Sequence, residues 1–160
     1  MTKAGNSAGT GDFKPATEDF AERVRDSFAK QGMMATLGAE LGEIEPGFYE
    51  IRMPYADAVA QQHGYIHGGA IATIADSAGG YAGLTLFDAD DGILTVEFKL
   101  NLIAPAKGEM LIACGHVVKP GRTLTVTRAD VVAVENGRET TCAVMQQTLM
   151  RIVGRDGVTG

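Results

Sequence analysis

A single carboxylate interrupts a long apolar segment of this sequence. Between Gly68 and Phe87 every residue is small, apolar, aromatic or hydroxyl-bearing except Asp76. A helix of this composition is apolar nearly all round and therefore belongs in the protein interior, where an unpaired charge is costly. We predict that Asp76 is a buried functional carboxylate, acting as a general base on water or as a nucleophile on an acyl carbon. The alternative is a structural carboxylate that caps a loop or pairs with an arginine.

The sequence His67-Gly68-Gly69 stands directly before the carboxylate-bearing part of this segment. Backbone N–H groups at a helix start can donate to a carbonyl oxygen that gains negative charge, and glycine permits close approach. The two glycines are equally typical of a tight turn into the helix. His63 and His67 are four residues apart, but Gly64 replaces the glutamate of a His-Glu-x-x-His motif, so we expect no metal site.

The stretch from His67 to Asp76 resembles the hotdog-fold acyl-coenzyme A thioesterases, in the branch related to phenylacetic-acid-pathway and 4-hydroxybenzoyl-coenzyme A thioesterases. In that branch a His-Gly-Gly turn precedes an acidic residue on the central helix. The resemblance extends from about Leu37 to Ile152 and includes the segments 94–106 and 119–124. It implies a hydrolase that cleaves an acyl-coenzyme A thioester into the free acid and coenzyme A, without a cofactor.

The resemblance also implies roles for individual residues. The N–H of Gly68 and the side chain of Gln61 would polarise the thioester carbonyl, and Gly69 would lie beside the bound substrate. His67 would orient the thioester or the turn, and Thr95 would help to hold the attacking water. For His67 and Thr95 the plainer alternatives are a hydrogen-bonded structural histidine and an ordinary strand residue.

Two basic residues, Lys119 and Arg122, flank a Pro-Gly turn. The resemblance implies that the phosphates of coenzyme A bind near such a turn, and cationic side chains suit phosphate groups. The alternative is a hairpin with solvated charges. The resemblance further implies a homodimer or homotetramer with active sites across the interface between chains.

Alternating residues at 94–103 predict a strand with one apolar face, formed by Leu94, Val96, Phe98, Leu100 and Leu102. The apolar helix, expected at about 69–86, would cover that face. We therefore expect the α+β hotdog fold, a long central helix wrapped by an antiparallel β-sheet, preceded by a short N-terminal amphipathic helix that Thr17 caps. The expected strands are 37–44, 48–53, 93–104, 109–118, 122–135 and 139–152, with a hairpin turn at Asn136-Gly137.

Composition sets the domain organisation and the class of partner. The chain has 160 residues, of which 45% are hydrophobic, and this suits one globular domain. We expect a flexible tail at 1–16, a single hotdog thioesterase domain at 17–153 and a C-terminal tail at 154–160. The net charge of −6 argues against a nucleic-acid partner. Cys114 and Cys142 match no metal-ligand spacing and are expected to be buried free thiols of a cytoplasmic protein. No segment approaches the ~20 apolar residues of a membrane span, so we expect no membrane partner.

Two other functions suit a hotdog domain. An acyl-thioester dehydratase or hydratase would need its own arrangement of an acid–base histidine and a carboxylate, which we do not find in the sequence. A non-catalytic acyl-coenzyme A-binding or regulatory protein would not need Asp76 in an apolar helix. The sequence does not decide between aryl and aliphatic acyl groups, or between coenzyme A and acyl-carrier protein.

Overall fold

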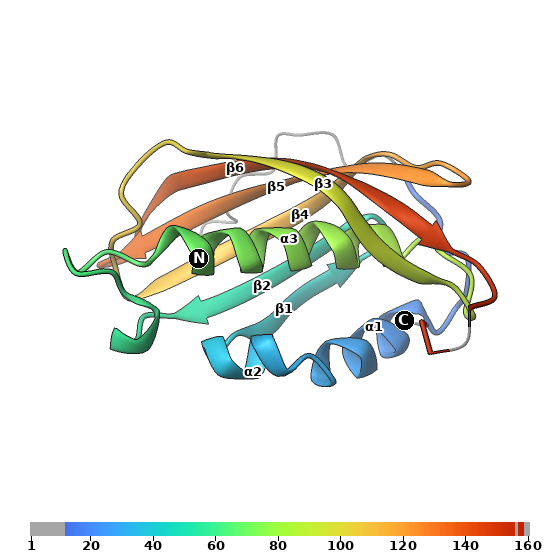
Figure 1. The fold of residues 1–160 in the computed structure, drawn as a ribbon, viewed down its shortest axis with the longest axis horizontal. Coiled ribbons are helices and arrows are strands. Elements are labelled where there is room, and N and C mark those ends of the chain that lie inside the picture. Colours follow the sequence, from blue (N-terminus) through green and yellow to red (C-terminus); the bar gives the residue numbers. More distant parts are fainter. Residues whose placement is uncertain (1–11, 156, 159–160) are drawn as a thin grey trace.

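The fold is a curved antiparallel sheet with one long helix lying across it (Figure 1). The computed structural model describes residues 12–155 and 157–158. Its six strands follow the order β1-β2-β4-β5-β6-β3, and every neighbouring pair is antiparallel. The strands are β1 (Glu40–Glu45), β2 (Phe48–Pro54), β3 (Gly92–Leu102), β4 (Met110–Lys119), β5 (Leu124–Glu135) and β6 (Arg138–Ile152). The helices are α1 (Phe20–Ala29), α2 (Gly32–Leu37), the short 3-10 helix η1 (Asp57–Val59) and α3 (Gly68–Leu84).

The long helix α3 lies close to the sheet because several of the facing residues are glycines. A Cβ atom on Gly115 of β4 would lie 2.2 Å from the carbonyl oxygen of Ala78 in α3. Two glycines on the helix have the same effect from the other side. A Cβ on Gly79 would lie 2.2 Å from the Gln147 side chain of β6, and one on Gly83 would lie 2.8 Å from Leu149. The sheet therefore bends around the helix backbone itself.

The N-terminal helix differs from the prediction at both of its ends. The predicted cap, Thr17, is wrong, because α1 begins at Phe20 with Asp19 at the N-cap position and no side-chain cap. The Thr17 hydroxyl is instead buried without a partner among the described residues. The sequence did not indicate α2, which begins at Gly32. Gly38, with a φ of 63°, ends α2 in the left-handed conformation that favours glycine.

A β-bulge in β3 corrects the predicted alternation of that strand. The register with β6 shifts between Thr95 and Glu97, which leaves Val96 as an extra residue. Phe98 pairs with the inward-facing Gln147, so Phe98 and the following even-numbered residues face the helix. Before the bulge the helix-facing residue is Thr95, whereas Leu94 faces away. The expectation that all five even-numbered apolar residues share one face is therefore wrong for those that precede Phe98.

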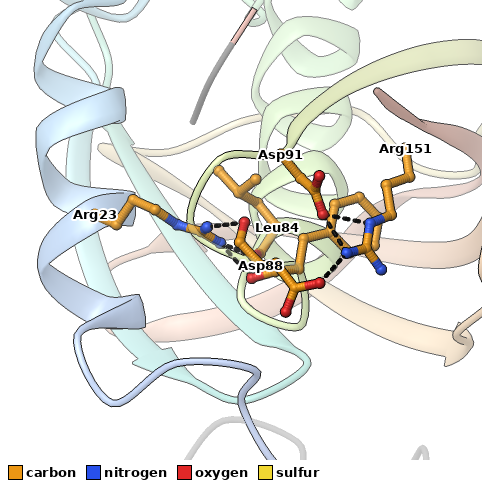
Figure 2. A network of polar contacts seen from close by, with 6 residues as sticks. Arg23, Leu84, Asp88, Asp91 and Arg151 are labelled. Atoms are coloured by element: carbon orange, nitrogen blue, oxygen red, sulfur yellow. Dashed lines mark hydrogen bonds and ion pairs between the residues drawn. The ribbon is translucent and has the colours of Figure 1, made fainter. Parts of the chain in front are cut away.

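Arg23 fastens α1 to the C-terminal end of α3 (Figure 2). Its guanidinium donates to the carbonyl oxygens of Leu84 at 2.7 Å and Phe87 at 2.8 Å. The last carbonyl groups of a helix lack partners within the helix, and a cation there is favourable. Arg151 of β6 lies over the Phe87 ring, 5.2 Å from its centroid. The same guanidinium forms ion pairs with two acidic residues of the α3–β3 loop, Asp88 and Asp91.

The terminal segments and the cysteines lie as follows. Residues 1–11 of the expected N-terminal tail, and residues 156 and 159–160 of the C-terminal one, lie outside the described residues. Phe13 packs against the core beside Gly47.

Cys142 is buried and Cys114 is half-buried; burial raises the pKa of the two thiols to about 11 and about 12 respectively. Within the described part of the chain, no helix has the length and apolar character needed to cross a membrane.

We expect Gly115→Ala to lower the free energy of unfolding by about 1–3 kcal/mol, because its methyl group would meet the backbone of α3. Gly80→Ala is the control, since a Cβ there meets nothing within 4 Å. It should raise stability by about 0.5–1 kcal/mol through the helix preference of alanine. Urea unfolding of both variants provides the measurement. Equal stability of Gly115→Ala and the parent protein would contradict the close packing of helix on sheet.

Candidate active site

Asp76 lies in the middle of α3 on the wall of a pocket with a volume of about 340 Å³. The prediction of a buried carboxylate is wrong in one respect: Asp76 is half-buried, as are its neighbours Ser77 and Gly80. The face of α3 toward the sheet is fully buried, whereas this flank opens into the pocket. The apolar composition of α3 therefore did not reveal that one flank remains partly open in a single chain.

Two neutral donors hold the Asp76 side chain. The Thr95 hydroxyl of β3 donates to Oδ1 at 2.7 Å. The Gln147 amide of β6 donates to the same oxygen and to the Asp76 backbone carbonyl, both at 3.1 Å. None of the ion pairs among the described residues includes Asp76. The alternative, in which an arginine pairs with this carboxylate, is therefore not observed among these residues.

The bulge in β3 makes the contact with Thr95 geometrically feasible. In a regular strand, Thr95 and Phe98 would point to opposite faces of the sheet, because they are three residues apart and side chains alternate along a strand. The bulge at Val96 shifts this alternation by one residue. With it, Thr95 reaches Asp76 and Phe98 also faces the helix. The structure thus brings together Asp76 and Thr95.

The start of α3 is organised by His67, which occupies the N-cap position. Its Nδ1 accepts a hydrogen bond from the Gly69 N–H at 2.9 Å. An accepting Nδ1 carries no proton, so the neutral ring bears its proton on Nε2. The Gly69 N–H is therefore engaged in the cap. The N–H of Gly68, at the first helical position, has no intrahelical acceptor, and none of the hydrogen bonds among the described residues uses it.

Gln61 and Gly68 share a second pocket, with a volume of about 250 Å³. The rest of its lining is apolar apart from Tyr65: Ile66, Ile71, Leu102, Ala104, Pro105 and Ala106. Gly68 precedes Asp76 by eight residues on one helix, which corresponds to about 12 Å along the helix axis. The sequence-predicted residues therefore form two groups within one chain, Asp76 with Thr95 and Gln61 with Gly68.

The two predicted phosphate-binding residues lie apart from both groups. Lys119 ends β4 and Arg122 lies in the turn before β5, and both side chains are exposed. Among the described residues that line the two pockets, neither is present. Their role in binding coenzyme A stays a prediction.

Sequence reasoning missed three residues of the Asp76 pocket. The Tyr81 hydroxyl accepts a hydrogen bond from Gln31 at 2.8 Å and lies 3.2 Å from the Ser27 hydroxyl. Burial raises the pKa of Tyr81, so this group stays a neutral hydroxyl. These side chains form a polar part of a wall whose apolar residues include Leu84, Ile93 and Leu94.

Gln147 was also missed, although the sequence carries a signal for it. In β6 the residues Ala143, Met145 and Leu149 are buried at alternate positions, and Gln147 occupies the same phase. An uncharged polar residue at an inward-facing position of an apolar alternation needs a hydrogen-bond partner. That partner is Asp76.

Comparison with known proteins identifies the family of this chain. A sequence profile described as the Thioesterase superfamily matches residues 63–140. A solved thioesterase family protein from Silicibacter pomeroyi is 49% identical, with a TM-score of 0.83, covering 84% of this chain and 99% of that one. This chain belongs to the thioesterase superfamily. The matched residues include the His-Gly-Gly turn, Asp76 and Thr95, but neither Gln61 nor Gln147.

Two other similar proteins are consistent with this family. The 1,4-dihydroxy-2-naphthoyl-CoA hydrolase of Listeria monocytogenes is 23% identical, over 59% of this chain and 77% of that protein. The structure of the PaaI protein from the phenylacetic acid degradation operon of Escherichia coli has a TM-score of 0.74 at 19% identity, covering 88% of this chain and 96% of that one. At that identity the likeness shows the fold alone. The predicted hotdog fold is thus confirmed, and the family supports thioester hydrolase activity.

Proposed function

We propose that this thioesterase-superfamily protein hydrolyses an acyl-coenzyme A thioester with Asp76 as the reacting carboxylate. The observation that carries the proposal is a half-buried carboxylate on a pocket wall, held by two neutral donors and by no cation among the described residues. Such a carboxylate keeps its charge available for a proton or an acyl carbon. The name of the Listeria relative supports coenzyme A as the carrier.

Two reaction courses use the same groups. As a general base, Asp76 takes a proton from water while the water oxygen attacks the thioester carbonyl carbon. The C–S bond then breaks, and the proton returns to the departing thiolate. As a nucleophile, the carboxylate itself attacks the carbonyl carbon, and the C–S bond breaks to release the thiolate as a mixed anhydride forms. Water then hydrolyses the anhydride to the free acid and the Asp76 carboxylate, and the proton set free passes to the thiolate. In both courses the Gly68 N–H and the Gln61 side chain stabilise the developing oxyanion.

This chemistry needs two chains, because within one chain Asp76 lies apart from Gly68 and Gln61. A thioester carbonyl must lie about 3 Å from its donors and from the attacking group. Gly68 and Asp76 of one chain are about 12 Å apart along α3. We therefore propose that Gly68 and Gln61 of the partner subunit complete the site at Asp76.

The edge strand β3 provides the surface for such a dimer. Val96, Phe98 and Leu102 are 57%, 48% and 56% exposed on this unpaired edge. Unpaired strand edges with apolar side chains favour pairing with another chain. Antiparallel pairing of two β3 strands about Phe98–Lys99 would cover these side chains. It would also place Thr95 beside Leu102 of the partner subunit, and so would join an Asp76 pocket to a Gly68 pocket. A tetramer would then be a pair of such dimers.

We expect Asp76→Asn to lower kcat by about a hundredfold or more, since the amide can neither take a proton nor attack. The protein should fold normally, because asparagine keeps the oxygen that accepts from Thr95 and Gln147. Thiol release from a panel of acyl-coenzyme A substrates measures the effect. Asp90→Asn, in the exposed α3–β3 loop, is the control. Turnover near that of the wild type in Asp76→Asn would refute the assignment.

We also propose that Lys119 and Arg122 bind the coenzyme A phosphates. Arg122→Glu should raise KM for an acyl-coenzyme A several-fold and leave KM for the matching acyl-N-acetylcysteamine unchanged, because only the former carries phosphates. Arg138→Glu, at the exposed start of β6 beside the opposite end of β5, provides the control. Equal effects of Arg122→Glu on both substrates would show that this turn does not bind the nucleotide.

Mixed dimers test the shared site. A hybrid of Asp76→Asn and Gln61→Ala chains has one intact site and one doubly altered site, if each site uses two chains. Random reassociation should then restore about a quarter of the wild-type activity from two inactive parents. Mass spectrometry of the intact dimers verifies that hybrids form. Hybrids without activity would mean that Gln61 and Asp76 act within one chain.

A further inference from the structure

The two oxygens of the Asp76 carboxylate have different surroundings. Oδ1 accepts hydrogen bonds from Thr95 and from Gln147, which occupy both of its lone pairs. The hydrogen bonds among the described residues give Oδ2 no donor. We propose, building on the hydrolytic function above, that Gln147 is a positioning residue that fixes Asp76 so that Oδ2 is the reacting oxygen.

Gln147 holds Asp76 at two points. Its amide nitrogen lies 3.1 Å from Oδ1 and 3.1 Å from the backbone carbonyl oxygen of Asp76. Because one amide group binds both the side chain and the backbone of the same residue, it opposes rotation of the carboxylate relative to the helix. The reverse orientation of the amide would set its oxygen against a carboxylate oxygen, so its donors must face Asp76.

The surroundings of Gln147 show that burying its side chain costs folding free energy. Its side chain is 1% exposed, and its Oε1 is buried without a partner among the described residues. The hydroxyl of Thr127, the residue opposite it in β5, is also buried and unpartnered. A Cβ on Gly79 would lie 2.2 Å from Gln147 Oε1 and 2.9 Å from Thr127 Oγ1, so the glycine leaves the room that the amide occupies.

A buried, unpaired amide oxygen opposes folding. A glutamine kept only for packing would be better replaced by an apolar side chain of similar size. A glutamine kept for the reaction would be retained despite this penalty, because unpaired and strained groups gather at functional sites. Both explanations allow an apolar side chain of similar size to keep or raise thermal stability, but only a glutamine kept for the reaction should lose turnover when it is replaced in this way.

Gln147→Met tests the proposal, because methionine matches the size of glutamine but cannot donate. We expect kcat to fall about 10- to 100-fold, the effect of a misplaced reacting group. KM should change by less than about twofold, and the melting temperature should stay the same or rise. Gln146→Met is the matched control: Gln146 neighbours Gln147 on the exposed face of β6, and its replacement should leave kcat, KM and melting temperature unchanged.

A double mutant separates action through Asp76 from a general disturbance. On the Asp76→Asn background, Gln147→Met should cost no further activity, because the group that it positions is already gone. Additive losses would overturn the proposal. A kcat of Gln147→Met within about twofold of the wild type would overturn it too. If Asp76→Asn is inactive in that case, the hydrolytic function still stands, whereas an active Asp76→Asn would refute the function itself.

Gln147→Glu covers the case in which Gln147→Met does not fold. Glutamate has the shape of glutamine but lacks its two N–H donors: ionised, it repels Oδ1, and protonated, its single O–H cannot bind both Oδ1 and the Asp76 backbone carbonyl. We expect a loss in kcat at least as large as that of Gln147→Met, again without an effect on the Asp76→Asn background. If neither variant folds, Gln147 is a residue of the fold's framework and the positioning role is wrong.

Discussion

The close approach of α3 to the sheet is the constraint on which the rest of the structure depends. Gly115 lies against the carbonyl of Ala78, so helix backbone and strand backbone meet without an intervening side chain. The sheet must curve around the helix to cover it, and its end strand β3 then runs along one flank of α3 (Figure 1). The two pockets open on that flank, because side chains of β3 line both of them.

Local irregularities then build the site on this frame. The bulge at Val96 turns Thr95 toward Asp76, and Gly79 admits the amide of Gln147 between helix and strand. Each device weakens regular structure: a bulge interrupts the ladder, and a glycine lowers helix stability. Such departures gather around one carboxylate, as expected where structure serves chemistry rather than stability alone.

The sequence predicted the features that depend on composition and failed on those that depend on register. The apolar segment and its single charge located α3 and Asp76, and Asn136-Gly137 located the β5–β6 turn, where both residues have positive φ. The extra residue in β3 left no visible trace, because Val96 is apolar like its neighbours. The separation of Gly68 from Asp76 needed only the rise of a helix, but the pocket that holds each residue depends on long-range strand pairing that no local pattern encodes.

The attachment of α1 bears on how such a protein can evolve. Arg23 binds backbone carbonyl oxygens at the end of α3, so the link tolerates changes in the side chains that it bridges. Ser27 of α1 and Gln31, which lies just after this helix, form part of the pocket wall. The groups that hold Asp76 come instead from β3 and β6. Mutations in this helix can thus reshape the cavity while the carboxylate keeps its contacts. Descendants of one ancestor could change the acyl groups they accept and retain the same reacting atoms.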